Sequence, residues 1–280
     1  MKSRILFLTV ALALISTAMA QKYDGYIKFE PDVPVGQKRQ GNDNEWSYIY
    51  YKSARDPRVM AGLWEAAGPR HVVRQNLDHT ELMHILRGSF TLTDSNDGHK
   101  DTFKAGDTVL VPRGTSYIWD QKSGSVRKYW VVFDPVPAAK HANAQAGTKT
   151  PTFVRLEANG PGGVGLKAGA QNTKEYTYFT GEDGSAVGIW ESAPTEDYGN
   201  FNNSQYAELM IFLTGSPRLV HSDGREEHYN AGDVVLVPYG VPHKWRSDTV
   251  RKFFVYFDVP QAKATAAASA SDSFKNKASR

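Results

Sequence analysis

Two stretches decide the fold of this chain: ELMHILRG at residues 81–88, and ELMIFLTG at residues 208–215, which begins 127 positions later. A second block, AGDTVLVPRG at 105–114, returns as AGDVVLVPYG at 231–240, after 126 positions. Segments that recur in the same order at nearly constant spacing are the signature of an internal repeat. We therefore interpret the chain as two copies of one structural unit.

Two further blocks extend the repeat on either side. Upstream, GLWE at 62–65 matches GIWE at 188–191. Downstream, VRKYWVVFD at 126–134 matches VRKFFVYFD at 250–258. Four blocks that recur in the same order do not arise by chance. Together they show that the duplication spans most of each unit.

Each unit reads as a series of short strands. Residues 108–111 and 234–237 are rich in β-branched side chains and lie between a Gly-Asp turn and a Pro-x-Gly turn. Asp97-Gly98 and Asp223-Gly224 lie between strand-like runs, as hairpin turns do. No amphipathic helix longer than two turns occurs within either unit. The sequence therefore predicts an all-β fold, either a sandwich or a barrel.

The spacing Glu-x6-Gly followed by Gly-Asp-x4-Pro-x-Gly resembles the two motifs of the cupin superfamily. The resemblance covers residues 46–137 and 172–260 and implies two tandem cupin jelly-roll β-barrels, a bicupin. One cupin subgroup in particular, the ureidoglycine aminohydrolase-type and ethanolamine-utilisation cupins, is similar in two features. These are the tryptophan after Pro-x-Gly, at Trp119 and Trp245, and the Val-Arg-Lys strand that follows it. The motif residues are Glu81, Gly88, Gly106, Pro112 and Gly114 in the first copy, and Glu208, Gly215, Gly232, Pro238 and Gly240 in the second.

The first 20 residues have the pattern of a secretory signal peptide. Lys2 and Arg4 precede an apolar run over 5–15 that is too short to span a bilayer, and Ala18-Met19-Ala20 is a small-x-small cleavage site. We expect a mature protein in the periplasm or secreted, with no membrane span after cleavage. The predicted organisation is a signal peptide at 1–20, an N-terminal cupin domain with a leading segment at 21–137, a linker at 138–150, a C-terminal cupin domain at 151–260 and a disordered tail at 261–280.

Composition excludes several classes of function. The chain has 33 Lys and Arg against 30 Asp and Glu, a net charge of +3, and no basic patch interleaved with aromatic residues, so nucleic acid is not an expected partner. It has no cysteine, which excludes disulfides, thiolate metal sites and a cysteine nucleophile.

In metal-binding cupins, two His and one Glu of the first motif join a His that follows the second motif. In the first copy the three His positions hold Arg74, Asn76 and Tyr117, and only Glu81 remains. An arginine repels a cation, but Arg74 could bind a carboxylate or phosphate, with Tyr117 as a donor. We name Arg74, Asn76, Glu81 and Tyr117 as candidate ligand-binding residues. The alternative is that Arg74 simply pairs with Glu81.

A cluster of histidines around the first motif offers a displaced metal site. His79 and Glu81 share one face of the expected strand, whereas His84 faces the other way unless a bulge intervenes, and His71 has the opposite parity to Arg74. His79 and Glu81 are therefore weak metal candidates that would need a further ligand.

The second copy keeps two of the four metal positions, Glu208 and His243. They are weak candidates for a divalent transition metal, such as manganese, iron, nickel, zinc or copper. Otherwise they form a metal-free acid–base pair, our candidate catalytic residues, or only a structural hydrogen bond. The remaining positions hold Phe201 and Asn203, or Asn202 and Ser204 if the loop is one residue shorter; we take Asn203 as a ligand-binding candidate.

These features predict an exported bicupin that binds a small polar or carboxylated metabolite and transforms it as an isomerase, lyase or hydrolase. The alternatives are a non-catalytic periplasmic binding protein and a structural dimerisation scaffold, and a homodimer is possible. Four repeated tryptophans are expected to pack the barrels, with an aromatic wall for a ligand as the alternative. They are Trp64, Trp119, Trp190 and Trp245.

Overall fold

The structure is a computed structural model that describes residues 23, 25–34, 37–135, 152–162, 165–168, 172–198 and 204–260, with the backbone alone for 195–198. The predicted signal peptide, linker and C-terminal tail lie outside the described residues.

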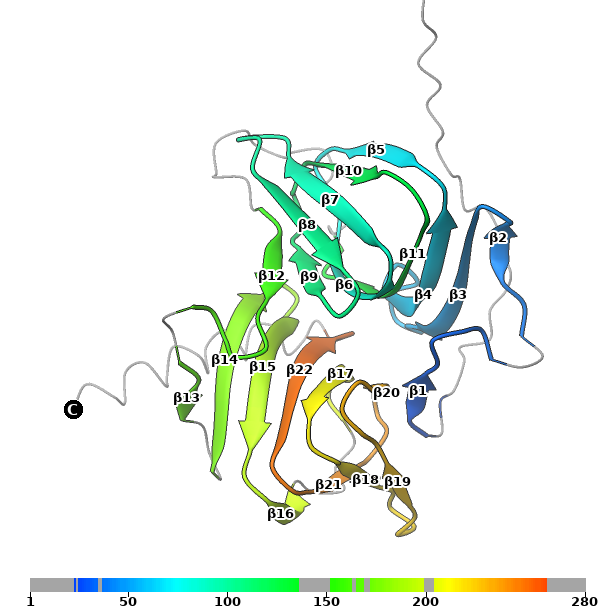
Figure 1. Ribbon diagram of the computed structural model, residues 1–280. Coiled ribbons are helices and arrows are strands. Elements are labelled where there is room, and N and C mark those ends of the chain that lie inside the picture. The colour runs from blue at the N-terminus through cyan, green and yellow to red at the C-terminus, as the bar shows by residue number, and fades with distance from the viewer. Residues whose placement is uncertain are drawn as a thin grey trace, which may run out of the picture.

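The predicted all-β fold is confirmed: the described residues form 22 strands in four antiparallel sheets and no helix. One large and one small sheet enclose the N-terminal barrel (Figure 1). In spatial order, the large sheet is β12 (Val154–Leu156), β9 (Thr108–Val111), β6 (Thr80–Arg87), β11 (Ser125–Phe133), β4 (Met60–Ala67), β3 (Glu45–Lys52) and β2 (Gln40–Asn42). The small sheet is β5 (Arg70–Arg74), β10 (Tyr117–Gln121), β7 (Ser89–Asp94) and β8 (Lys100–Lys104).

The C-terminal barrel repeats this arrangement (Figure 1). Its large sheet is β1 (Ile27–Phe29), β20 (Val234–Val237), β17 (Ala207–Thr214), β22 (Val250–Phe257), β15 (Ala186–Ser192), β14 (Thr173–Thr180) and β13 (Lys167–Ala168). Its small sheet is β16 (Thr195–Tyr198), β21 (Lys244–Ser247), β18 (Arg218–Val220) and β19 (Glu226–His228). The two predicted β-branched strands are β9 and β20.

The two barrels exchange their first strands. β1 precedes the N-terminal barrel in sequence but pairs with β20 of the C-terminal barrel, and β12 follows the linker but pairs with β9 of the N-terminal barrel. The sheets therefore cross the domain boundaries that the sequence predicts, and each barrel is completed by a strand from the other unit's stretch of sequence.

The aspartate of each Gly-Asp turn holds the exchanged strand. Arg155 of β12 forms an ion pair with Asp107 at 2.6 Å, and Lys28 of β1 forms one with Asp233 at 2.8 Å. Asp107 also accepts a hydrogen bond from the backbone of Lys104, which closes its own turn. One side chain thus serves both the turn and the strand exchange.

Strand alternation explains why the ELM blocks are apolar throughout. Successive side chains point to opposite faces, and both faces of these strands are covered. Leu82 and Leu209 pack in the core shared by the two large sheets, whereas Met83 and Met210 pack inside their own barrels. Burial on both faces is what joins the two barrels into one body.

The same alternation explains the repeated Arg-Lys pair on β11 and β22. Arg127 pairs with Glu65 of the neighbouring β4, and Arg251 pairs with Glu191 of β15. The next residue in each strand points into the barrel; in β11 it is Lys128. In each copy, the arginine of the Val-Arg-Lys block therefore pairs with the glutamate of the Gly-x-Trp-Glu block outside the barrel. The lysine of the Val-Arg-Lys block places a cation inside it.

Candidate functional site in the N-terminal barrel

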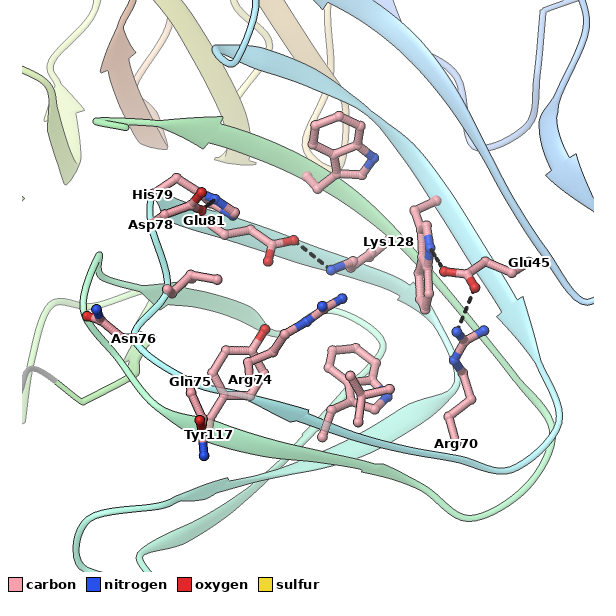
Figure 2. Close-up of a pocket in the computed structure, with 15 residues that line it drawn as sticks. Glu45, Arg70, Arg74, Gln75, Asn76, Asp78, His79, Glu81, Tyr117 and Lys128 are labelled. Carbon is pink, nitrogen blue, oxygen red and sulfur yellow. Dashed lines mark hydrogen bonds and ion pairs between the residues drawn. The ribbon is translucent and has the colours of Figure 1, made fainter. Parts of the chain in front are cut away.

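A cavity of about 640 Å³ opens into the N-terminal barrel between its two sheets (Figure 2). Its wall combines aromatic rings with charged groups, the composition expected of a small-molecule pocket. The lining residues are Glu45, Trp64, Arg70, Val72, Arg74, Gln75, Asn76, Leu77, Asp78, His79, Glu81, Tyr117, Trp119, Lys128 and Trp130. All four predicted ligand-binding residues of the first copy are among them.

An ion pair between Glu81 and Lys128 forms the inner wall of the cavity. Glu81 at the start of β6 accepts a hydrogen bond from Lys128 Nζ of β11 at 2.7 Å, and both side chains are largely buried. Burial raises the pKa of Glu81, but the charges of Lys128, His79 and Arg74 outweigh burial and hold that pKa below its usual range. Glu81 is therefore a carboxylate.

Two indole rings flank the Lys128 ammonium. Its Nζ lies 5.1 Å from the centre of the Trp64 ring and 5.3 Å from that of Trp119, within the range of a cation–π contact. The two rings meet edge to face at 5.9 Å. These tryptophans pack the barrel, as predicted, and they also line the cavity.

Arg74 and Tyr117 face each other across the β5–β10 pair at the rim of the small sheet. Burial and the Glu81 carboxylate raise the pKa of the Tyr117 hydroxyl, and the Arg74 guanidinium opposes them. Figure 2 shows the Arg74 side chain extending into the cavity toward Glu81 and Lys128. The ion-pair partner of Glu81 within hydrogen-bond distance is Lys128, and Arg74 acts on Glu81 through its charge.

The histidines around the first motif do not converge on Glu81. His71 bonds Asp120 at 2.6 Å on the outer surface, and His84 lies beside Thr108 on the far face of β6. His79 does line the cavity, on the same side as Glu81, as predicted. Asn76 also lines it, from a left-handed backbone conformation with φ of 46°, which asparagine tolerates.

The residues present do not fit a divalent metal. No group of three His, Asp or Glu side chains converges within the described part of the chain. Beside Glu81, an ion would meet the cations Lys128 and Arg74. The weak metal candidates His79 and Glu81 therefore lack the further ligand that they need.

The C-terminal barrel contains the same inner wall. Lys252 Nζ donates to Glu208 Oε1 at 2.6 Å and lies 5.1 Å and 4.2 Å from the ring centres of Trp190 and Trp245. Burial lowers the pKa of Lys252, while Glu208 opposes that change. Glu208, predicted to work with His243, thus already has a charged partner.

His243 lies close enough to Glu208 for their charges to interact. Burial lowers the pKa of His243, the Glu208 carboxylate opposes this and the Lys252 ammonium adds to it, so the imidazole is neutral at neutral pH. The rings of Tyr206 and Tyr256 lie 4.2 Å apart, and burial, together with the Glu208 charge, strongly raises the pKa of Tyr256. Asn203, also predicted to bind a ligand, lies outside the described residues.

Sequence reasoning missed the two lysines. The signal was present, since Lys128 and Lys252 occupy the same place in the repeated Val-Arg-Lys block. A search guided by metal ligands passes over a lysine, because an ammonium cannot coordinate a metal ion. The lysine at the same position in both copies was the signal that could have identified them.

Comparisons with known proteins agree with this fold. The EutQ-like cupin domain family matches residues 54–130 and again residues 180–254. A search of curated proteins finds no match. Among solved structures, a protein of unknown function of the DUF861 family from Pseudomonas syringae pv. tomato is 21% identical with a TM-score of 0.61, covering 84% of this chain and 100% of that one. Ylba from E. coli is 13% identical with a TM-score of 0.55, covering 86% and 94%.

Proposed function

This chain belongs to the EutQ-like cupin family, and we propose that its N-terminal barrel binds a small metabolite through a carboxylate group. The observation that carries the proposal is the Arg74 guanidinium, which extends into the cavity without a carboxylate partner within ion-pair distance among the described residues. Arginine presents a planar set of donors that matches a carboxylate.

The other charges of the wall are already paired. Each carboxylate that lines the cavity already has a partner within hydrogen-bond distance, and none of these partners is Arg74. The pairs are Glu45 with Arg70 at 2.6 Å, Asp78 with His79 at 2.6 Å and Glu81 with Lys128 at 2.7 Å. A bound carboxylate would give the Arg74 guanidinium the ion-pair partner that the described wall does not supply.

The binding test compares Arg74→Gln with Arg225→Gln, an exposed arginine of the C-terminal barrel. Titration calorimetry with acetate, propionate and succinate on the mature chain should show binding that Arg74→Gln weakens about tenfold or more, because a charge-assisted bidentate contact is lost. Arg225→Gln should bind as the wild type does. Equal affinities in all three proteins would refute the proposal.

We propose further that the protein acts after export, in the periplasm or outside the cell. The support is the charged, apolar and small-residue pattern of residues 1–20, which has the form of a signal peptide. Among the residues that the structure describes, none forms a helix long and apolar enough to cross a membrane.

A second candidate function is proton transfer in the C-terminal barrel. The neutral, partly buried His243, whose pKa the Glu208 charge influences, favours it, since an imidazole in that form can accept a proton. Reactions of the isomerase, lyase or hydrolase type use such a base. Once a reaction is identified, His243→Gln should remove it while ligand binding to the N-terminal barrel persists; full activity in that variant would eliminate His243 as the base.

A further inference from the structure

Each barrel holds a cation against the glutamate of its first motif. Lys128 Nζ lies 2.7 Å from Glu81, and Lys252 Nζ lies 2.6 Å from Glu208. In the metal-binding cupins that this chain resembles, this glutamate is a metal ligand. In this chain, the position beside the carboxylate that a metal would share is taken by an ammonium group.

The surroundings of Lys128 are built for a cation of this kind. Two indole faces flank the ammonium, and one of its three N–H groups points to Glu81. A second points to the sulfur of Met83 at 2.8 Å, a weak acceptor. The third has no acceptor among the described residues, and Lys128 lines the cavity.

We propose that the Lys128 ammonium takes the place of the cupin metal ion, and that Lys128 and Arg74 together bind a 2-oxo or 2-hydroxy carboxylate. Arg74 holds the carboxylate and Lys128 donates to the oxygen on the neighbouring carbon. The inference rests on the proposed function, because it needs the carboxylate at Arg74.

The arrangement of the two cations selects this chemical class. Figure 2 shows the Arg74 and Lys128 side chains, from β5 and β11, directed toward one region of the cavity, and both charges act on Glu81. A ligand with one carboxylate satisfies Arg74 alone. A ligand with a second oxygen on the adjacent carbon can accept hydrogen bonds from both Arg74 and Lys128. The same two neighbouring oxygens would bind to a metal ion at this position.

The pairing with Glu81 also determines how Lys128 acts. The ammonium is engaged by a carboxylate at 2.7 Å, so Lys128 donates a hydrogen bond and does not attack a carbonyl carbon. Pyruvate should therefore bind reversibly, and borohydride should trap no adduct on Lys128. An adduct on Lys128 that carries the mass of pyruvate less one oxygen atom would overturn the proposed role.

The main experiment uses three acids of equal length on the full mature chain treated with chelator. Calorimetry should show that pyruvate and lactate bind about tenfold more tightly than propionate, the ratio expected when one hydrogen bond from a charged group is added. The double variant Lys128→Met/Glu81→Gln removes the ion pair without leaving a lone charge. It should bind all three acids with the affinity of propionate, and thermal unfolding verifies that it is folded. Lys122→Met, an exposed lysine outside the cavity, should keep the preference.

The outcomes separate this inference from the proposed function. Binding of propionate with no preference for pyruvate or lactate in the wild type, or a preference that survives in the double variant, would overturn the inference alone. Binding of none of the acids would overturn both.

A metal measurement provides a second, independent readout. Wild-type protein equilibrated with manganese, nickel or zinc and then desalted should retain no stoichiometric metal. One metal ion per chain that is lost in Glu81→Gln would show that a metal, and not Lys128, occupies this position.

Discussion

Lys252 and Glu208 form an ion pair at 2.6 Å whose side chains are 4% and 5% exposed. Its counterpart in the N-terminal barrel, Lys128 with Glu81, lies in the wall of an open cavity. The same pair thus has two settings in one molecule. The buried pair contributes to the packing of its barrel, and the pair that borders the cavity is also available to a ligand.

Removing one member of the buried pair should be costly. Lys252→Met leaves the Glu208 charge desolvated and should lower the free energy of unfolding by about 3–5 kcal/mol. Lys252→Met/Glu208→Leu removes both charges and should recover most of the loss, because a buried pair is often no better than an apolar replacement. Urea unfolding measures both. A double variant no more stable than the single one would show that the pair does not act as a unit.

The strand exchange predicts that a residue outside the lining of the N-terminal cavity controls stability. Phe29 of β1 is buried, its ring stacks on that of Tyr50 at 4.3 Å, and its carbonyl accepts from the Tyr129 hydroxyl at 2.9 Å. Phe29→Ala should cost about 3–5 kcal/mol, the usual price of removing a buried aromatic ring. Lys28→Ala on the same strand removes only a half-exposed ion pair and should cost less than about 1 kcal/mol.

Because β1 and β12 tie the barrels to each other, the Phe29→Ala loss should appear in a single cooperative transition. Calorimetry would test this. Two separate transitions, with only the C-terminal one shifted, would mean that the exchanged strands do not couple the barrels.

Export can be tested on the protein itself. Expression of the full chain in a bacterial host should yield a mature protein that begins at Gln21, because the small-x-small site ends at Ala20. N-terminal sequencing of the periplasmic fraction measures this. Retention of Met1 on the folded protein would contradict cleavage, and Ala20→Arg provides the control, since a bulky charged residue at the cleavage site should block processing.

The duplication and the barrel could be predicted because the repeat blocks combine turn chemistry with strands that are buried on both faces. The exchange of β1 and β12 could not. Each is only three residues long, so no alternation identifies it. Its partner is also distant along the chain: Arg155 pairs with Val109 and Lys28 pairs with Val235.

The candidate site was predicted in part for a related reason. Arg74 and Tyr117 follow from motif positions, and strand pairing does place them opposite each other. Lys128 was overlooked because its role depends on Glu81, which lies 47 residues earlier in the sequence on the neighbouring strand β6. No local pattern distinguishes an inward lysine from a solvated one. Side-chain direction on β11 is what reveals it.

A pair of aspartates at the junction of the two barrels gives the last prediction. Asp134 and Asp258 end the equivalent strands β11 and β22, both with positive φ. Asp258 forms an ion pair with Arg55 at 2.9 Å. Asp134 forms an ion pair with Arg113 at 3.0 Å, but the negative charge of Asp183 also acts on it. Burial and the Asp183 charge raise the pKa of Asp134 to about 7, although Arg113 opposes them.

An aspartate whose pKa is higher in the folded state than in the unfolded chain binds its proton more tightly when folded. Between about pH 4 and pH 7 the unfolded chain has lost this proton and the folded chain keeps it, so stability falls as pH rises through that window. Asp134→Asn removes this dependence. The free energy of unfolding of this variant, relative to that of the wild type, should increase by on the order of 2–4 kcal/mol between about pH 4 and about pH 8. Urea unfolding across this range measures the gain, and Asp258→Asn, which loses the ion pair with Arg55, should show no such gain. A stability difference between Asp134→Asn and wild type that stays constant with pH would mean that Asp134 is ionised throughout, with Arg113 as its dominant neighbour.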